Sequence, residues 1–129
     1  MSYTHEDIKE IFQEDDFKEL IRRFKRIGIL AYNYNNQIGE YTFFGDHCDQ
    51  LVLTDQGPTL EPEEKTDTVA IQQAVKKYQS GALKFEAFAR EVAAAGIFSW
   101  ETNLEKLSVE FYNKRGEVTY REVFASIFD

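Results

Sequence analysis

The densest group of chemically capable side chains in this 129-residue sequence is Asp46-His47-Cys48-Asp49. A thiol, an imidazole and carboxylates are ligands that zinc accepts, and a cysteine beside a histidine can supply a nucleophile with its base. However, a structural zinc site needs about four ligands, and elsewhere only His5 and scattered acids remain. Adjacent side chains of an extended chain point to opposite faces, and neighbouring carboxylates disfavour a thiolate. We therefore expect a polar hairpin turn here, with no metal, no cofactor and no catalytic residue.

A second candidate site is a set of aromatic side chains on expected strands. Tyr32 and Tyr34 alternate along one strand, and Trp100 lies on another. Rings with polar tips suit pockets and interfaces, so these three residues, with Tyr112 and His47, are candidate ligand-binding residues. The alternative, which we favour, is that the aromatic face is core between the sheet and its helices. A cavity wall and a core face show the same alternation, so spacing alone does not separate them.

No stronger catalytic or cofactor pattern is present. The sequence lacks GxGxxG, GxxxxGK[ST], HExxH, CxxC and GxSxG, which mark dinucleotide, nucleotide, zinc, redox and serine-hydrolase sites. Glu61 with Glu63-Glu64 is expected to be solvated rather than catalytic. No enzyme class is therefore indicated, and we lean away from an enzyme.

The elements that must position these residues repeat along the chain, with Phe85 standing 68 residues after Phe17. At this offset the identical pairs are Phe17/Phe85, Arg22/Arg90, Gly28-Ile29/Gly96-Ile97, Asn35/Asn103 and Phe43/Phe111. In both copies apolar residues follow i, i+3, i+4, i+7, which predicts an amphipathic helix, and a glycine then ends that helix. After the glycine the apolar period changes to two, which predicts strands.

The sequence thus predicts an α+β fold made by tandem duplication. Each unit is expected to hold two helices and a three-stranded antiparallel meander, with the two units related by a pseudo-two-fold axis. We expect a single domain over 1–129, with repeat one at 1–53, repeat two at 66–129 and a linker at 54–65. The linker holds both prolines and has little to bury. Strands are expected near 29–34, 40–44, 50–54, 97–102, 107–112 and 117–120, and the tail after 120 is either a short helix or a strand end.

The second repeat carries a resemblance to a known family. Its sequence FEAFAREVAAAGIFSWETNLEKLSVEFYNKRGEVTYRE, Phe85–Glu122, runs helix, Gly-Ile, aromatic strand, a strand ending in Phe-Tyr, a turn with glycine and a strand. This layout resembles the YdfO-like (YbcV-like) family of small bacterial and prophage proteins, and Phe17–Leu53 resembles it less. The family implies no activity and no catalytic residue, and its prophage setting implies an accessory protein.

Charge and composition limit the partners. The formal net charge of −8 repels phosphate backbones, so we expect no nucleic-acid partner. One expected helix is basic, with Lys18, Arg22, Arg23, Lys25 and Arg26 against Glu19. It is interpreted as a solvated face, with a small docking surface for an acidic partner as the alternative.

The expected setting is cytoplasmic. No apolar run approaches the roughly 20 residues that span a bilayer, and the polar start MSYTHEDIKE lacks the features of a signal peptide. The single cysteine, Cys48, excludes an intramolecular disulfide and suits a reducing compartment. We therefore expect no membrane partner, and the oligomeric state stays open.

Three functions follow from these patterns. The first is a non-enzymatic accessory or interaction protein that binds a protein partner or a small ligand. The second is a small enzyme or ligand-binding domain with an aromatic pocket at the repeat junction, which a deep pocket would favour and a packed junction would exclude. The third is an acidic decoy that imitates nucleic acid, which requires Glu6, Asp7, Glu10, Glu14 and Asp15 to line one face with the linker acids.

Overall fold

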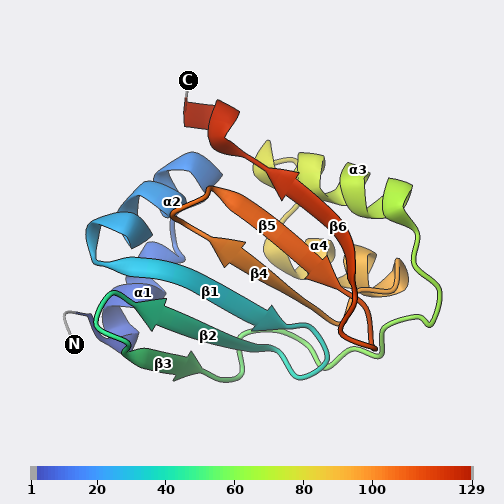
Figure 1. The fold of residues 1–129 in the computed structure, drawn as a ribbon, viewed down its shortest axis with the longest axis horizontal. Helices are drawn as coiled ribbons and strands as arrows, with labels where there is room; N and C mark the ends of the chain where they lie inside the picture. Colours follow the sequence, from blue (N-terminus) through green and yellow to red (C-terminus); the bar gives the residue numbers. More distant parts are fainter. Residues whose placement is uncertain (1–2, 129) are drawn as a thin grey trace.

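The computed structural model describes residues 3–128 and consists of a six-stranded antiparallel sheet with helices on one face (Figure 1). The helices are α1 (His5–Ile11), α2 (Phe17–Arg26), α3 (Thr68–Gln79) and α4 (Phe85–Ala94). The strands are β1 (Ile29–Asn35), β2 (Glu40–Gly45), β3 (Gln50–Leu53), β4 (Ser99–Asn103), β5 (Ser108–Tyr112) and β6 (Val118–Val123). The predicted α+β class is confirmed. No helix within residues 3–128 has the length and apolar character to cross a bilayer.

The C-terminal tail combines both structures that its sequence allowed. Strand β6 runs on to Val123, and a short 3-10 helix follows at Ala125–Phe128. The tail's last residue, Asp129, lies outside the described residues.

Local sequence explains where the helices begin and end. Thr4 caps α1 reciprocally, because its hydroxyl accepts from the Asp7 amide at 3.2 Å while its own amide donates to the Asp7 carboxylate at 2.9 Å. Asp16 caps α2 by accepting from the Lys18 amide at 3.1 Å. Helices α2 and α4 stop before Gly28 and Gly96, whose φ angles of +92° and +95° favour glycine.

The strand order is β3-β2-β1-β4-β5-β6, so each half supplies three consecutive strands and the halves meet at β1 and β4. In this central antiparallel pair, Asn33 faces Glu101 and Tyr34 faces Trp100. Outside this central pair, β1 pairs with β2 and β4 pairs with β5 in the same register. Tyr32 faces Phe43 in one half, and Trp100 faces Phe111, at the equivalent positions, in the other.

A single core of buried residues runs between the sheet and the helices across both halves. Tyr34 lies at its centre, fully buried, with ring centroids 4.5 Å from Tyr41 and 4.9 Å from Trp100. The ring of Phe85 meets Tyr34 edge-on at 5.0 Å. Aromatic rings therefore join the two halves at the middle of the sheet.

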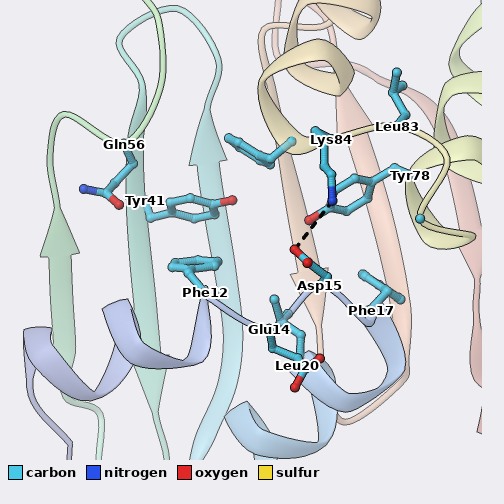
Figure 2. A pocket seen from close by; sticks show the side chains of 12 residues that line it. Phe12, Glu14, Asp15, Phe17, Leu20, Tyr41, Gln56, Tyr78, Leu83 and Lys84 are labelled. Carbon is cyan, nitrogen blue, oxygen red and sulfur yellow. Dashed lines mark ion pairs between the residues drawn. The ribbon is translucent and has the colours of Figure 1, made fainter.

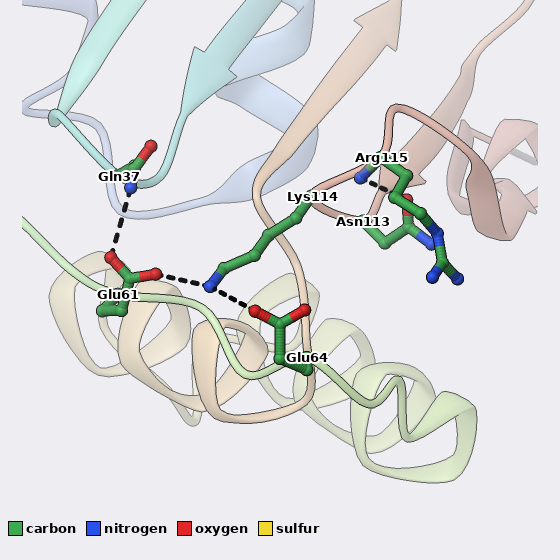
Figure 3. Close-up of polar contacts among 6 residues, drawn as sticks. All are labelled: Gln37, Glu61, Glu64, Asn113, Lys114 and Arg115. Atoms are coloured by element: carbon green, nitrogen blue, oxygen red, sulfur yellow. Dashed lines mark hydrogen bonds and ion pairs between the residues drawn. The ribbon is translucent and has the colours of Figure 1, made fainter.

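Residues 54–65, called the strap below, pack more closely than their composition indicated. Lys114 in the β5–β6 turn lies 2.5 Å from a Glu61 carboxylate oxygen and 3.0 Å from Glu64, and the Gln37 amide donates to Glu61 at 3.2 Å (Figure 3). Pro62 is buried. Glu61 and Glu64 are solvated as expected, with side chains 71% and 82% exposed, and they also tie the strap to turns in both halves of the sheet.

Candidate functional site: a pocket between the helix pairs

Three of the five candidate ligand-binding residues lie together beneath the helices. Tyr32, Tyr34 and Trp100 are 5%, 0% and 4% exposed, on the face of the sheet that packs against α2 and α4. The ring of Tyr32 contacts Phe24 of α2 at 5.4 Å, and Trp100 contacts Phe88 of α4 at 5.2 Å. Most of this aromatic face is therefore core.

Tyr112 and His47 lie away from this group. Phe111 takes the inward position of β5, and successive strand residues face opposite sides. Tyr112 therefore points to the open side of the sheet, where its hydroxyl donates to Glu110 at 3.3 Å. His47 is in the exposed β2–β3 turn, 3.6 Å from the Asp46 carboxylate. Including these two residues in one site with Trp100 is inconsistent with their positions.

The junction of the two halves is hollow on the helix side. A cavity of about 230 Å³ opens between the helix pairs, with the sheet as its floor (Figure 2). A smaller space of about 30 Å³ shares the lining residues Phe17, Tyr41, Tyr78 and Phe85, and reaches Tyr32 and Trp100. Tyr32 and Trp100 line only this smaller space, which adjoins the cavity at the place where the sequence offered a pocket as an alternative.

Five aromatic rings form the wall of this pocket, and we call them the aromatic cage: Phe12, Phe17, Tyr41, Tyr78 and Phe85. Phe12 lies 4.8 Å from Tyr41 on one side, and Phe17 lies 5.9 Å from Tyr78 on the other. Phe85 connects the sides, with its ring 5.8 Å from Tyr41 and 6.3 Å from Tyr78. Phe17 and Phe85 are the first residues of α2 and α4, so both helix starts point a ring into the cavity.

Two hydroxyl groups converge on the cavity. Figure 2 shows the phenolic oxygens of Tyr41 and Tyr78 directed toward its centre from opposite sides. Within residues 3–128, neither hydroxyl has a hydrogen-bond partner. Burial raises the pKa of Tyr78 to about 12 and the pKa of Tyr41 well above its ordinary value of 10. Both phenols therefore stay neutral at physiological pH, and each can donate and accept a hydrogen bond.

Charged side chains surround the mouth. The Lys84 ammonium lies 3.7 Å from the Asp15 carboxylate, and both side chains are largely exposed. Glu14 also lines the mouth, and its carboxylate accepts from the Asp16 amide at 3.1 Å. Lys84 is the N-cap residue of α4 but makes no side-chain capping bond.

Sequence reasoning missed Tyr41 and Tyr78 as pocket residues. The signal available was a tyrosine among apolar residues on an expected buried face, because Tyr41 alternates with Phe43 and Tyr78 follows Ile71 and Val75 at helical spacing. That signal identifies a buried ring. It does not show that the ring borders a cavity, because the cavity arises from how the helix pairs are spaced.

The side chains that reach the pocket interior support binding rather than bond-making chemistry. Apart from the charged residues at the mouth, they are aromatic or aliphatic, with two neutral phenols and the carboxamide of Gln56. The one thiol, Cys48, is exposed in the β2–β3 turn. Among the described residues, no group of three or more histidine, cysteine or acidic side chains is arranged to hold a metal ion.

Residues 5–123 match the family described as Protein of unknown function (DUF1398). The chain belongs to this family. No curated protein matches the chain. Since the family carries no activity to transfer, the function of this member must be argued from its pocket.

Proposed function

We propose that this member of the DUF1398 family is a non-enzymatic binding protein that holds a small molecule in the aromatic pocket. The observation that carries the proposal is the pair of phenols. Tyr41 is 4% exposed, and its hydroxyl points into a cavity without a partner among the described residues. Because this hydroxyl is open to the cavity, a bound molecule with a polar group can exchange a hydrogen bond with it in place of water.

The architecture gives this pocket a structural origin. We propose that the chain is a tandem duplication with a pseudo-two-fold axis through the Asn33–Glu101 pair, whose members lie 68 residues apart. Hydrogen bonds at the junction support it: the Leu104 amide donates to Leu30 at 2.9 Å, and the Asn36 amide donates to Phe98 at 2.8 Å. Each bond maps onto the other at the same offset. We also propose that the chain is related to the YdfO-like (YbcV-like) family and shares its prophage setting.

The other functions have less support. The basic face of α2 is partly occupied within the chain, because Arg22 lies 3.4 Å from Glu19 and 5.7 Å from the Phe128 ring centre. Two of the five acids needed for a nucleic-acid decoy are also ion-paired with helix or loop residues of the same chain. Glu10 lies 3.9 Å from Arg23, and Asp15 lies 3.7 Å from Lys84.

The test of the pocket is a fragment screen. Neutral, cationic and anionic fragments that fit a cavity of about 230 Å³ would be screened by thermal unfolding. Hits would then be titrated while following Trp100, the only tryptophan, which lines the smaller space beside the cavity. Hits with a polar group should lose about five- to tenfold in affinity in Tyr41→Phe or Tyr78→Phe, because each variant removes one hydrogen bond without changing ring volume.

The matched control is Tyr112→Phe, which removes a phenolic hydroxyl on the opposite face of the sheet and should leave affinity unchanged. The proposal is wrong if no fragment binds, or if binding is insensitive to both pocket variants.

We also propose that the protein does not bind duplex nucleic acid at physiological salt. Fifteen basic residues stand against 23 acidic ones, and phosphate binding depends on Lys and Arg. An anisotropy titration at about 0.15 M salt should show no complex up to micromolar protein. A tighter complex that Arg22→Glu with Arg26→Glu abolishes would contradict this and would assign a nucleic-acid role to α2.

A further inference from the structure

We infer that the ligand of this pocket is a neutral molecule with a carbonyl group, whose oxygen lies between the Tyr41 and Tyr78 hydroxyls. This inference rests on the proposed binding function and specifies its ligand class. Three features of the pocket lead to it: the direction of the two phenols, the scarcity of other polar groups in the interior, and the cost of placing a charge there.

The two phenols form a pair of donors on opposite sides of the cavity. Tyr41 belongs to β2 and Tyr78 to α3, and Figure 2 shows the hydroxyl ends of both side chains directed toward the centre. Burial raises the pKa of Tyr41, and the nearby Tyr78 phenol raises it further, so the two groups lie within electrostatic reach of each other. A carbonyl oxygen has two lone pairs, and it can therefore accept one hydrogen bond from each phenol.

Few other polar groups reach the interior. Away from the mouth, the other side chains that line the cavity are Phe12, Phe17, Leu20, Leu83, Phe85 and Gln56. The Gln56 amide group donates to the Thr54 carbonyl at 2.8 Å. Figure 2 shows Gln56 on the side of Tyr41 that is away from Tyr78. A ligand hydroxyl between the phenols would need one of them as its acceptor, and only the other could then donate to it. A carbonyl group uses both donors and has no hydrogen to place.

The interior also lacks a counter-ion for a charged ligand. Among the described residues that line the cavity, the cation is Lys84 and the anions are Glu14 and Asp15. The side chains of Lys84 and Asp15 are 78% and 87% exposed and pair with each other, and Glu14 accepts from the Asp16 amide. A charged group among the rings would lose water without gaining an opposite charge, which is costly. Burial raises the pKa of Tyr78 to about 12, so the site already disfavours a charge on its own phenol.

The test compares compounds of one shape that differ in the head group. A cavity of about 230 Å³ equals the liquid volume of roughly eight water molecules, which admits one six-membered ring with a short head group. Acetophenone carries the carbonyl group, α-methylstyrene has a methylene group in place of that oxygen, and 1-phenylethanol has a hydroxyl. Benzoate and benzamidinium supply an anion and a cation.

Each compound would be titrated into the full chain by calorimetry. Acetophenone should bind at least about tenfold more tightly than either ion, because an ion is desolvated in the pocket without a partner. It should bind about threefold more tightly than 1-phenylethanol, because the hydroxyl can receive a hydrogen bond from only one of the two phenols.

Two variants attribute the preference to the phenols. The quantity measured is the affinity for acetophenone divided by the affinity for α-methylstyrene, since a change in packing that affects both compounds cancels in this ratio. Tyr41→Phe and Tyr78→Phe should each lower the ratio about fivefold, because each removes one hydrogen bond to the carbonyl oxygen. Tyr112→Phe removes a phenolic hydroxyl on the opposite face of the sheet and should leave the ratio unchanged.

The ligand class and the pocket function fail in different ways. If the ratio is the same in the unsubstituted protein and in both pocket variants, the carbonyl inference is overturned. If an ion or 1-phenylethanol binds more tightly than acetophenone and Tyr41→Phe weakens that binding, the inference is overturned while the pocket remains a binding site. The same conclusion holds if acetophenone does not bind but other fragments do, in a manner sensitive to Tyr41→Phe or Tyr78→Phe. If no compound of any kind binds, the proposed function is refuted together with the inference.

Discussion

At the scale of single residues, Tyr34 shows how closely the centre of the molecule is packed. Its side chain is fully buried, and its hydroxyl has no hydrogen-bond partner in the described part of the chain. Gly57 of the strap lies directly against that hydroxyl, so that a Cβ atom at Gly57 would overlap the phenolic oxygen and lie 3.3 Å from Cζ. The absence of a side chain at Gly57 is therefore what lets the strap cross Tyr34.

This contact predicts a coupled pair of substitutions. Gly57→Ala should lower the free energy of unfolding by about 1–3 kcal/mol, because the new methyl group overlaps Tyr34 in a tightly packed site. Tyr34→Phe should be neutral or raise it by up to about 1 kcal/mol, since it removes an unsatisfied buried hydroxyl. The double variant should recover much of the loss, which urea unfolding would measure.

The control is Tyr112→Phe, which removes a hydroxyl from the open side of the sheet and should change stability little. Additive effects of Gly57→Ala and Tyr34→Phe would show that the two residues do not touch as described.

Residue types predicted burial better than they predicted the site. Alternation placed Tyr32, Tyr34 and Trp100 on one buried face, and the structure brings these three together. Phe111 and Tyr112 are neighbours on one strand, so the same alternation predicts that they face opposite sides of the sheet. Since Phe111 is the inward residue, Tyr112 should have been assigned to the open side. The pocket residue Tyr78 was visible only as one position of an apolar helix face.

At the scale of elements, the strap behaves as part of the fold through contacts distant in sequence. Its backbone is held at three places, since the amides of Gln56, Leu60 and Glu63 donate to Gly39, Gln37 and Ala93 at 2.8, 3.2 and 3.0 Å. Lys114 adds the ion pairs with Glu61 and Glu64. Composition could not reveal this, because Lys114 stands 50 residues from Glu64.

The strap should loosen in acid. Hydrogen bonds from Lys114 and Gln37 hold the pKa of Glu61 below its ordinary value of 4.5. A carboxyl with a lowered pKa stabilises the folded state above its unfolded pKa, and this contribution is lost as the pH falls through the folded pKa. Amide exchange at Gln56, Leu60 and Glu63, corrected for intrinsic rates, should therefore accelerate as the pH falls below about 4.5.

Lys114→Met should produce fast exchange in the strap already at neutral pH and remove most of its acid dependence. Arg115→Met is the matched control, because Arg115 lies in the same turn but pairs with Glu117 at 3.0 Å. Equal exchange rates in the Lys114 variant and the unsubstituted protein would show that backbone bonds alone hold the strap.

Element boundaries were predictable where one physical signal dominated. Gly28 and Gly96 marked the helix ends because a positive φ suits glycine. The sequence predicted that the last strand ends at residue 120, whereas β6 continues to Val123. The prediction stopped short because Glu122 occupies an inward position, where its carboxylate accepts a hydrogen bond from the Gln79 amide at 3.3 Å. Burial raises the pKa of Glu122. A polar residue in an inward position breaks the apolar alternation on which the prediction depends.

At the scale of the whole molecule, the register of the central strands bears on how the fold arose. Strands β1 and β4 pair so that Asn33 faces Glu101, with Tyr32 opposite Thr102 and Tyr34 opposite Trp100. With a shift of 68 residues this pairing maps onto itself. An ancestral single unit could therefore have formed the same sheet as a homodimer, with two copies of one strand meeting about a true two-fold axis.

The proposed duplication predicts that the second half can associate with itself. A fragment of residues 66–129 has an unpaired β4 edge and an uncovered core, so as a monomer it should be largely unfolded. In a dimer through β4, Glu101 of one copy would face Glu101 of the other, and like charges directly opposite destabilise a sheet. Glu101→Asn places there the residue that the first repeat has at the equivalent position, Asn33, and removes the repulsion.

Sedimentation and circular dichroism of the fragment should therefore show concentration-dependent folding that is stronger with Glu101→Asn than without it. Glu110→Asn is the matched control, because it removes the same charge from the neighbouring strand β5, across from Glu101, and should promote association less. A fragment that stays unfolded at every concentration with either substitution would show that the two halves have diverged too far to replace one another. In that case only the first half can cover the aromatic face around Trp100. The pocket then depends on differences between the halves, such as Tyr41 in the first half where the second has Val109, as much as on the strand order that the halves share.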